Sequence, residues 1–248
     1  MNIIIGMTTA KMPLVVLGAA GKMGAKVVAR IKSSPDCALA GAFDTASAPG
    51  VLPPSRLKPA LKKARAAIEF AGPEAAASYA GICAVLGRPI VIGSTGFSAE
   101  QMKVVKAASK AVPVFLSPNM SPAVNLTFAV AKLMAAKLGP AFDIHISETH
   151  HKFKKDAPSG TALKYLAHIK EAYSGSVSVT SARAGDIIGE HSVLFAGPHE
   201  RVELVHRAHS RDVFAEGAVK AALWLAGQKP GLYDYFDLLG LNSLVERL

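Results

Sequence analysis

Pro13-Leu-Val-Val-Leu-Gly18-Ala-Ala-Gly21-Lys-Met-Gly24 is the stretch that decides the fold of this chain. It begins with a continuous apolar run that ends in glycine, which is typical of a strand buried on both faces of a parallel sheet. Apolar residues then recur at helical spacing from Lys22 to Ser33. Glycines between a strand and a helix let the backbone approach a pyrophosphate at the helix N-terminus. The stretch therefore predicts a dinucleotide-binding βα unit, with an ordinary tight turn as the alternative.

Asp44 supplies the acidic residue that such a unit requires. It lies twenty residues after Gly24, at the end of a predicted strand, where a carboxylate can accept hydrogen bonds from both adenosine ribose hydroxyls. Asp44 would repel the 2′-phosphate of NADP, and Thr45 stands where an arginine would favour that phosphate. We therefore expect NADH to be the preferred cofactor, while Lys22 in the loop leaves NADPH as an alternative.

The first half of the chain alternates between predicted strands and helices. Strands are expected over 13–18, 37–43, 66–70, 89–93 and 112–116, and helices over 22–33, 74–86 and 99–109. This alternation predicts the α/β class, with a Rossmann-type doubly wound parallel sheet.

The pattern changes after Asn119. Helices are expected over 125–138, 160–173 and 217–225, and strands over 143–148 and near 176–183, 187–196 and 201–209, with a hairpin turn at 196–200. Several consecutive strands predict a second, α+β domain built on a mixed or antiparallel sheet. We expect residues 1–122 plus 215–248 to form the dinucleotide-binding domain and residues 123–214 to form the second domain.

Two turns that follow predicted strands extend the expected cofactor site. They are Gly93-Ser94-Thr95-Gly96 and Ser117-Pro118-Asn119-Met120. Loops after parallel strands lie at the carboxyl edge of the sheet, where ligands bind, so their backbone groups could fix a nicotinamide amide. Ordinary turn chemistry is the alternative.

Acid–base residues gather in His150-His151-Lys152-Phe153-Lys154-Lys155-Asp156-Ala157-Pro158-Ser159-Gly160-Thr161. If the preceding strand continues, His150 and His151 point to opposite faces, so that one can reach the reacting atom while the other holds substrate. The nearby lysines would lower the pKa of an imidazolium and attract a dicarboxylate. The helix start at Ser159 offers free N–H groups as a carboxylate seat.

The residues of this segment also allow other roles. The histidines could be structural, or the basic loop could bind phosphate or nucleic acid. Glu148, His150 and His151 could be metal ligands, but their spacing is not that of a helix-borne zinc pair and lysines oppose a cation, so no metal is expected. The remaining histidines, including His191, are scattered and show no evident partner.

The composition and net charge of the chain fit an enzyme that acts on a small molecule. Half of the 248 residues are hydrophobic and 19% are charged, so a packed core is expected. The net charge of +10 comes from residues spread along the chain, so we expect no nucleic acid as partner. No apolar run is long enough to span a bilayer, and residues 1–12 are expected to be a short extension. Cys37 and Cys83 lack ligand spacing and are expected to be reduced, buried thiols of a cytoplasmic protein.

Taken together, these motifs resemble the dihydrodipicolinate reductase family over about Leu14 to Leu241. The most specific part is Glu148-x-His-His-x-x-Lys-x-Asp-Ala-Pro-Ser-Gly-Thr161, and the supporting stretches are the Gly18 loop, 91–97, Asn119 with Asn125, 183–191 and 236–241. The resemblance implies His150 as proton donor and acceptor and Lys154 as a second proton donor. It implies a substrate-binding and oligomerisation role for the second domain, and a homotetramer.

By the same resemblance, two sets of residues contact ligands. Those implied to hold the substrate are His151, Ser159, Gly160 and Thr161. Those implied to contact the cofactor are Gly18, Ala19, Ala20, Gly21, Lys22, Met23, Asp44, Gly93, Ser94, Thr95, Ser117, Pro118, Asn119 and Met120.

Some positions depart from the family pattern. Thr45 replaces a basic residue that some members use for NADP, and Ala71-Gly72 stands where a hydroxyl residue is common. The turn 120–123 differs from the usual one, and the link from Tyr173 to Arg183 is short.

The expected activity is NAD(P)H-dependent reduction of 4-hydroxy-tetrahydrodipicolinate, a small dicarboxylate of diaminopimelate and lysine biosynthesis. One alternative is another two-domain dehydrogenase of an amino-acid pathway, which would not need the paired histidines. The other is a non-catalytic, NAD-sensing binder of nucleic acid, suggested only by the charge.

Overall fold

The computed structural model describes residues 10–245, and the chain divides into two compact units. The first unit comprises the chain up to Leu116 together with Ala218–Leu232, and the second comprises Ser117–Gly217 together with the chain from Tyr233 onward. Residues 1–9 of the expected N-terminal extension lie outside the described residues, whereas Met12, also assigned to it, is the first residue of a strand. None of the described helices is both long and apolar enough to cross a membrane.

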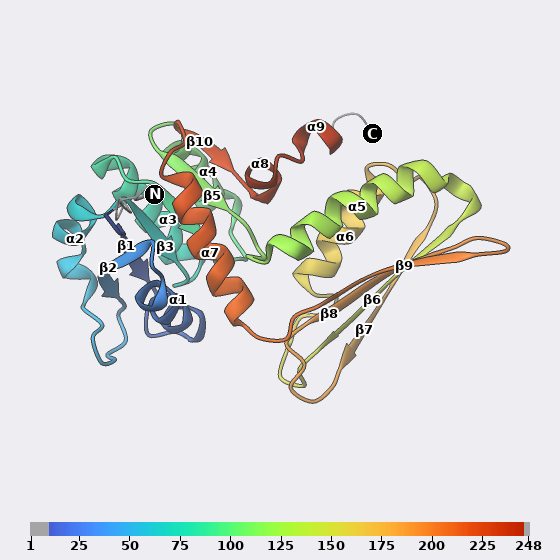
Figure 1. Ribbon diagram of the computed structural model, residues 1–248, viewed down its shortest axis with the longest axis horizontal. Helices are drawn as coiled ribbons and strands as arrows, with labels where there is room; N and C mark the ends of the chain where they lie inside the picture. The colour runs from blue at the N-terminus through green and yellow to red at the C-terminus, as the bar shows by residue number, and fades with distance from the viewer. Residues whose placement is uncertain (1–9, 246–248) are drawn as a thin grey trace, which may run out of the picture. The chain divides into compact units, whose positions relative to one another are not determined.

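A six-stranded sheet in the order β10-β5-β4-β3-β1-β2 forms the centre of the first unit (Figure 1). Its elements are β1 Met12–Leu17, α1 Lys22–Ser33, β2 Cys37–Phe43, η1 Pro54–Arg56, α2 Leu57–Lys63, β3 Ala66–Glu69, α3 Pro73–Leu86, β4 Ile90–Ile92, α4 Ala99–Ser109, β5 Pro113–Leu116 and β10 Gly231–Tyr233. Neighbouring strands from β1 to β5 pair in parallel. The central residues Leu14 to Leu17 are fully buried, so the prediction of a strand covered on both faces is confirmed.

The strand order reverses between β1 and β3 because α1 leads to β2 on one side and α2 leads back to β3 on the other. Ligands of open parallel sheets bind outside the carboxyl ends of the strands at such a switch point. The loop from Gly18 to Gly24 follows β1, and Asp44 follows β2. The topology therefore brings both predicted cofactor elements to one edge of the sheet.

The short elements η1 and α2 were not predicted from the sequence. Leu57 and Leu61, one helical turn apart, are buried in the core of the first unit together with Val15 and Leu17 of β1. Two apolar residues that are one helical turn apart give only a weak periodic signal, which does not distinguish a short helix from a loop.

The second unit is built on a four-stranded mixed sheet in the order β7-β6-β8-β9. Its elements are α5 Pro122–Leu138, η2 Gly139–Ala141, β6 Asp143–His150, α6 Gly160–Lys170, β7 Val177–Arg183, β8 Glu190–Ala196, β9 Arg201–Arg207, α8 Tyr235–Leu239 and α9 Asn242–Val245. The pairing is parallel between β6 and β7 and antiparallel from β6 through β8 to β9. The expected hairpin turn is present, since Gly197 N–H donates to the Glu200 carbonyl at 2.9 Å.

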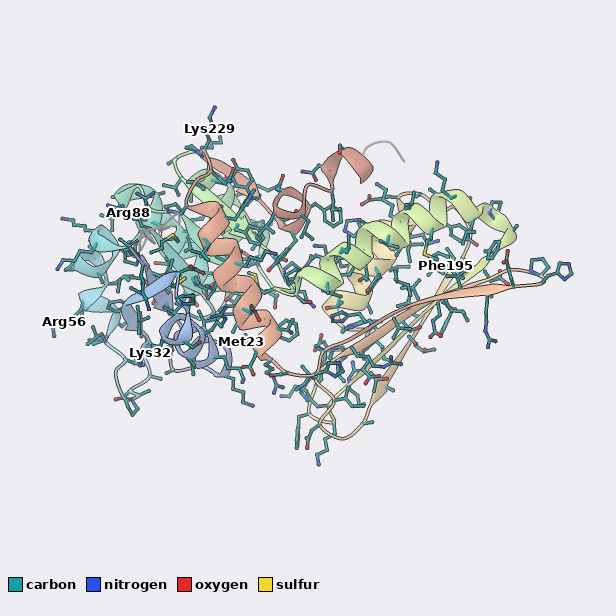
Figure 2. The ribbon with its side chains drawn as sticks, in the orientation of Figure 1. Met23, Lys32, Arg56, Arg88, Phe195 and Lys229 are labelled. Atoms are coloured by element: carbon teal, nitrogen blue, oxygen red, sulfur yellow. The ribbon has the colours of Figure 1, made fainter. Side chains whose placement is uncertain are left out.

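The helices α5 and α6 lie together over one face of this sheet (Figure 1). Figure 2 shows Phe195 of β8 on the side of the sheet that faces them, where it packs in a core with Phe128 and Tyr165. Successive positions in β6 and β8 alternate between buried and more exposed, as the period of a half-buried strand requires.

The end of the chain differs from the expected domain division, which assigned residues 215–248 to the first domain. Helix α7, Asp212–Leu225, contains the change from one unit to the other, whereas Tyr235 and Phe236 of α8 belong to the second unit. Tyr235 Oη donates to the Met120 carbonyl at 2.7 Å, and Phe236 joins the core around Phe128. These contacts give the C-terminal aromatic residues their burial.

Candidate functional site

The glycine loop of the first unit has room only for glycine at two positions. Gly18 has a φ of 78°, and a Cβ there would lie 2.6 Å from the Ala71 backbone nitrogen. A Cβ on Gly24 would lie 2.0 Å from the Gly18 carbonyl oxygen. Such close packing brings the start of α1 against the end of β1, as a dinucleotide loop requires.

The start of α1 fits an anionic ligand. Its N-cap residue Gly21 makes no side-chain cap hydrogen bond, and no acidic residue stands in the first turn, where Lys22 is the first residue. The N-terminal N–H groups and the helix dipole are therefore available to an anion, since no side chain in the described part of the chain accepts a hydrogen bond from the first helical turn. The loop thus fits the pyrophosphate of a dinucleotide.

Asp44 is bonded to this loop. Its Oδ2 accepts from the Ala20 N–H at 3.0 Å and its Oδ1 accepts from the Ala46 N–H at 2.9 Å. Burial acts to raise the pKa of Asp44, but these backbone hydrogen bonds outweigh it and the pKa is lowered. The carboxylate is therefore ionised at neutral pH and fixes the loop with one of its oxygens.

A cavity of about 520 Å³ opens beside Thr45. Its lining residues are mostly apolar: Thr45, Pro54, Ser55, Leu57, Lys58, Ala75, Ser78, Tyr79 and Ile82. Cavities of this size with a few polar groups are typical of small-molecule and cofactor sites. The sequence did not indicate it, because one of its walls is formed by η1 and α2, which were not predicted, and the other by α3.

Glu69, which the sequence analysis did not single out, ties together two loops at the carboxyl edge of the sheet. It is fully buried and accepts from the Ala71 N–H, from the Gly72 N–H at 3.1 Å and from Ser94 Oγ at 2.8 Å. Burial raises the pKa of Glu69. The predicted cofactor residue Ser94 is thus buried in a network, whereas its neighbour Thr95 is exposed.

Gly93 permits a close approach of β4 and β3. A Cβ on Gly93 would lie 2.2 Å from the ring of Phe70. Of the predicted cofactor residues 93–95, Gly93 is therefore required by packing against Phe70, and Thr95 has an exposed side chain.

The turn Ser117–Met120 lies in the second unit, although it was expected in the first domain. Ser117 Oγ donates to the Asn119 carbonyl at 2.8 Å, and Asn119 Nδ2 donates to Thr161 Oγ1 at 3.1 Å. A predicted cofactor turn and a predicted substrate residue are thus joined by a direct side-chain hydrogen bond. Pro118 lies between these residues in the chain.

His150 is the last residue of β6 and faces inward. Residues alternate along this strand, so His150 shares the buried face with Glu148 and Ile146 and is 8% exposed. Its Nδ1 contacts Glu148 Oε2. Burial is the main cause that lowers the pKa of His150, against the raising effect of Glu148, with smaller contributions from Lys154 and Arg183. Of the lysines predicted to repel the imidazolium, Lys154 contributes to this lowering, but burial is the larger cause.

Glu148 and Arg183 form a bidentate ion pair below His150. Arg183 Nη2 donates to Oε1 at 2.9 Å and Nη1 donates to Oε2 at 3.1 Å. Burial acts to raise the pKa of Glu148, but its polar interactions with Arg183, Ser181 and His150 outweigh it and lower the pKa to about 2. Glu148 is therefore a carboxylate throughout the physiological pH range.

The loop after β6 carries the other predicted residues. Lys154 Nζ lies 2.9 Å from both carboxylate oxygens of Asp156, and Lys152 lies 5.1 Å from the ring centre of Phe153. His151 Nδ1 is buried and has no hydrogen-bond partner among residues 10–245. This unsatisfied nitrogen is the kind of group that a ligand or a water molecule completes.

The start of α6 has a side-chain cap and also has backbone N–H groups that are free to bind a ligand. Ser159, which is buried, caps the helix because its Oγ accepts from the Ala162 N–H at 3.2 Å. The N–H groups of Gly160 and Thr161 form no hydrogen bond within the described part of the chain. A Cβ on Gly160 would meet nothing within 4 Å, so the space before the helix is free. The start of α6 therefore has free N–H groups of the kind that a carboxylate seat needs, and the seat itself stays a prediction.

His191 belongs to this cluster, although the sequence analysis treated it as scattered. Its Nε2 lies 3.2 Å from Ser159 Oγ, and its ring meets that of His150 edge-on with centroids 5.1 Å apart. Burial, followed by the charges of His150 and His206, lowers the pKa of His191 to about 3. The signal lay in the strand register, which places His191 opposite Glu148.

The described residues contain no group of three or more His, Cys, Asp and Glu side chains arranged to hold a metal ion. Cys37 and Cys83 are buried and free, and burial raises the pKa of Cys83 to about 12.

Comparison with known proteins identifies both units. Residues 12–120 match the model described as dihydrodipicolinate reductase, N-terminus, and residues 123–239 match the model described as dihydrodipicolinate reductase, C-terminus. The 4-hydroxy-tetrahydrodipicolinate reductase of Anaeromyxobacter dehalogenans (strain 2CP-1) is 40% identical over 93% of this chain and 98% of its own. The enzyme of the same name from Syntrophus aciditrophicus is 38% identical over 92% of this chain and 98% of its own.

A solved structure has the same fold. The dipicolinate-bound dihydrodipicolinate reductase from Paenisporosarcina sp. TG-14 matches with a TM-score of 0.78 at 22% identity, covering 93% of this chain and 100% of its own.

Gly24→Ala should weaken binding of NADH. The added Cβ must displace the Gly18 carbonyl, and overpacking of this kind costs about 1–3 kcal/mol, so we expect the Kd to rise roughly tenfold or more. Fluorescence titration of NADH measures it. Gly81→Ala, in α3, is the matched control because its Cβ would meet nothing within 4 Å. An unchanged Kd in a folded Gly24→Ala protein would contradict the assignment of the loop.

Proposed function

Since the chain belongs to the dihydrodipicolinate reductase family, we propose that the cluster around His150 and the loop after it carry the reduction that this family performs. The protein is an NAD(P)H-dependent oxidoreductase that acts on 4-hydroxy-tetrahydrodipicolinate in diaminopimelate and lysine biosynthesis. This sets aside the two alternative functions, another amino-acid dehydrogenase and a nucleic-acid binder. The observation that supports the residue roles is the buried His150 beside the open start of α6.

The reduction adds one hydride and one proton to the substrate. Loss of water leaves a conjugated cyclic imine, and reduced nicotinamide, when bound, supplies the hydride to a ring carbon. The displaced electron pair moves along the conjugated system to the ring nitrogen, where negative charge develops. Cationic side chains stabilise that charge most where it grows. A proton from His150 or Lys154 completes the product.

The substrate carboxylates are proposed to bind at the start of α6. The free N–H groups of Gly160 and Thr161 suit one carboxylate, and the unpartnered His151 and the cationic loop suit the other. Ser159 shapes the seat as the cap of the helix. The Paenisporosarcina relative is described as dipicolinate-bound, and we propose that this chain binds dipicolinate too, at the start of α6.

The cofactor is proposed to be held by three groups of residues. They are Gly18, Ala19, Ala20, Gly21, Lys22, Met23 and Asp44, then Gly93, Ser94 and Thr95, then Ser117, Pro118, Asn119 and Met120. The unoccupied N–H groups at the start of α1 support the pyrophosphate seat, and the apolar cavity beside Thr45 suits an adenine. NADH is proposed as the preferred cofactor because Asp44 is ionised and would repel a 2′-phosphate.

Assembly as a homotetramer through the second unit is also proposed. The face of the four-stranded sheet opposite α5 and α6 has no helix of residues 117–217 packed on it, and Val205 there is 37% exposed. Sheet faces of this kind pack against another layer in stable domains. A cytoplasmic location is proposed from the buried, free state of Cys37 and Cys83.

His150→Gln and Lys154→Ala should each lower turnover with NADH. Loss of a general acid is expected to reduce kcat by about 10²-fold or more. Spectrophotometric oxidation of NADH in the presence of the substrate measures it. Lys137→Ala, which removes an exposed cation from α5, is the control and should keep normal turnover. Near-normal activity in both site variants would refute the assignment.

Asp44→Asn should shift the cofactor preference towards NADPH. The unmodified protein should have the higher kcat/KM with NADH, and relief of the repulsion should raise the NADPH-to-NADH ratio roughly tenfold, or about 1.4 kcal/mol. Steady-state assays with both cofactors give the ratio. The same change at the exposed carboxylate of Asp36 should leave the ratio as it is. If Asp44→Asn does so too, Asp44 does not set the preference.

Val205→Lys should break the tetramer. Val205 lies on the edge strand β9, and a lysine there would place like charges from different chains in a buried layer of the assembly. Sedimentation velocity should show four chains per particle before the change and fewer after it. Val104→Lys on α4 is the control, since Val104 has a similar exposure of 44% in the other unit. A particle of one chain in the unmodified protein would exclude the proposal.

A further inference from the structure

The Glu148 carboxylate joins the proposed proton-transfer group to the loop that follows it. Its side chain is 0% exposed. It accepts four hydrogen bonds: from Arg183 Nη2 at 2.9 Å, from Arg183 Nη1 at 3.1 Å, from the Ser159 N–H at 3.2 Å and from His150 Nδ1. Three elements, namely β6, β7 and the start of α6, therefore meet on one carboxylate.

Arg183 extends the same network to the lysine loop. Its Nε donates to the Lys154 carbonyl at 3.3 Å, its Nη1 to the Ala182 carbonyl at 2.6 Å and its Nη2 to the Asp156 carbonyl. With the two bonds to Glu148, the five N–H donors of a guanidinium all have acceptors. A change of the Arg183 rotamer would leave several of these groups unpaired. The guanidinium that binds Glu148 therefore also holds the backbone around Lys154 in place.

Glu148 also decides which nitrogen of His150 carries the hydrogen. An ionised carboxylate only accepts hydrogen bonds, so His150 Nδ1 must be the donor and Nε2 is left with the lone pair in the neutral ring. No hydrogen bond to Nε2 is formed within the described residues. A Cβ on Gly189 would lie 3.0 Å from Nε2, so the glycine leaves that nitrogen its space.

We propose that Glu148 is a positioning residue for the reduction: together with Arg183 it fixes the tautomer and the orientation of His150 and holds the backbone of the Lys154 loop. The inference rests on the proposed role of His150. In a buried ion pair the cost of desolvation largely offsets the attraction, so stability alone is a weak reason to bury Glu148 and Arg183. Fixing a catalytic imidazole through its other nitrogen is an established use of such a carboxylate.

Charged and titratable groups face His150 from every strand around it. They are Glu148 on β6, Lys154 on the following loop, Arg183 on β7 and His191 on β8. Only Glu148 favours the imidazolium, whereas the cations oppose it. Removing the carboxylate should therefore lower the pKa of His150 further and move its limb of the pH–rate profile to lower pH.

The test is a cycle of Glu148→Gln, His150→Gln and the double variant, each assayed for kcat and KM across pH. Glu171→Gln is the matched control, because it makes the same change in the ion pair of Glu171 with Lys132, between α5 and α6, away from His150. If Glu148 acts through His150, Glu148→Gln should lower kcat roughly 10- to 100-fold and move the limb to lower pH. In the His150→Gln background it should then lower kcat little further. Glu171→Gln should leave kcat unchanged.

Some results would overturn the inference. One such result is full turnover in Glu148→Gln. Another is a double variant whose loss of kcat is the product of the two single losses, together with an unchanged position of the His150 limb in the pH–rate profile, as a purely structural role would give. If Glu148→Gln does not fold, Glu148→Asp keeps the charge opposite Arg183 but shortens the reach to Nδ1. It should show the same non-additivity with His150→Gln.

A spectrum of ¹⁵N-labelled histidine gives a readout apart from activity. The unmodified protein should show a neutral His150 with hydrogen on Nδ1, assigned by its loss in His150→Gln, and the opposite tautomer would overturn the inference. Normal turnover in both His150→Gln and Lys154→Ala would instead remove the proposed function of the site. If His150→Gln lowers turnover and Glu148→Gln does not, only the role proposed for Glu148 is excluded.

Discussion

A carboxylate buried on the inner face of β6 is the constraint on which the second unit depends. Strand alternation puts Ile144, Ile146, Glu148 and His150 on one face, so the apolar core continues into a polar cluster without a break. A carboxylate at 2% exposure persists only when charged and hydrogen-bonding partners replace water. Arg183 supplies those partners, and its remaining donors fix the loop after β6. The same face of β6 therefore contributes both to the apolar core and to the candidate site.

Much of the fold could be predicted because its elements have strong local signals. The apolar run ending at Gly18 identified β1, and the bounds 22–33 and 37–43 agree with α1 and β2. The mixed sheet was predicted from consecutive strands, but its parallel β6–β7 pair depends on contacts between distant segments. Helix α8 was missed because its five residues are held by Tyr235 and Phe236 packing on the second unit. Tertiary contacts, which one sequence does not display, set such short elements.

The candidate site was predictable where its residues are neighbours in the chain. His150 and Ser159 were found from one motif, and the structure brings them to the same cluster through Glu148 and His191. Strand register alone places His191 opposite Glu148, so local pattern reasoning took it for a scattered residue. Glu69 was missed for a similar reason, since its partners come from two different loops.

The segment Ser117–Gly217 of the second unit is inserted between two segments of the first, and this affects how the chain can fold during synthesis. The buried residues Ala218 and Leu225 of α7 belong to the first unit, where Trp224 meets Phe115 edge-on at 6.3 Å. The edge strand β10 follows only at Gly231. A ribosome therefore releases the glycine loop long before the last piece of its sheet. The dinucleotide unit closes late, over contacts of long sequence separation, which are slow to form.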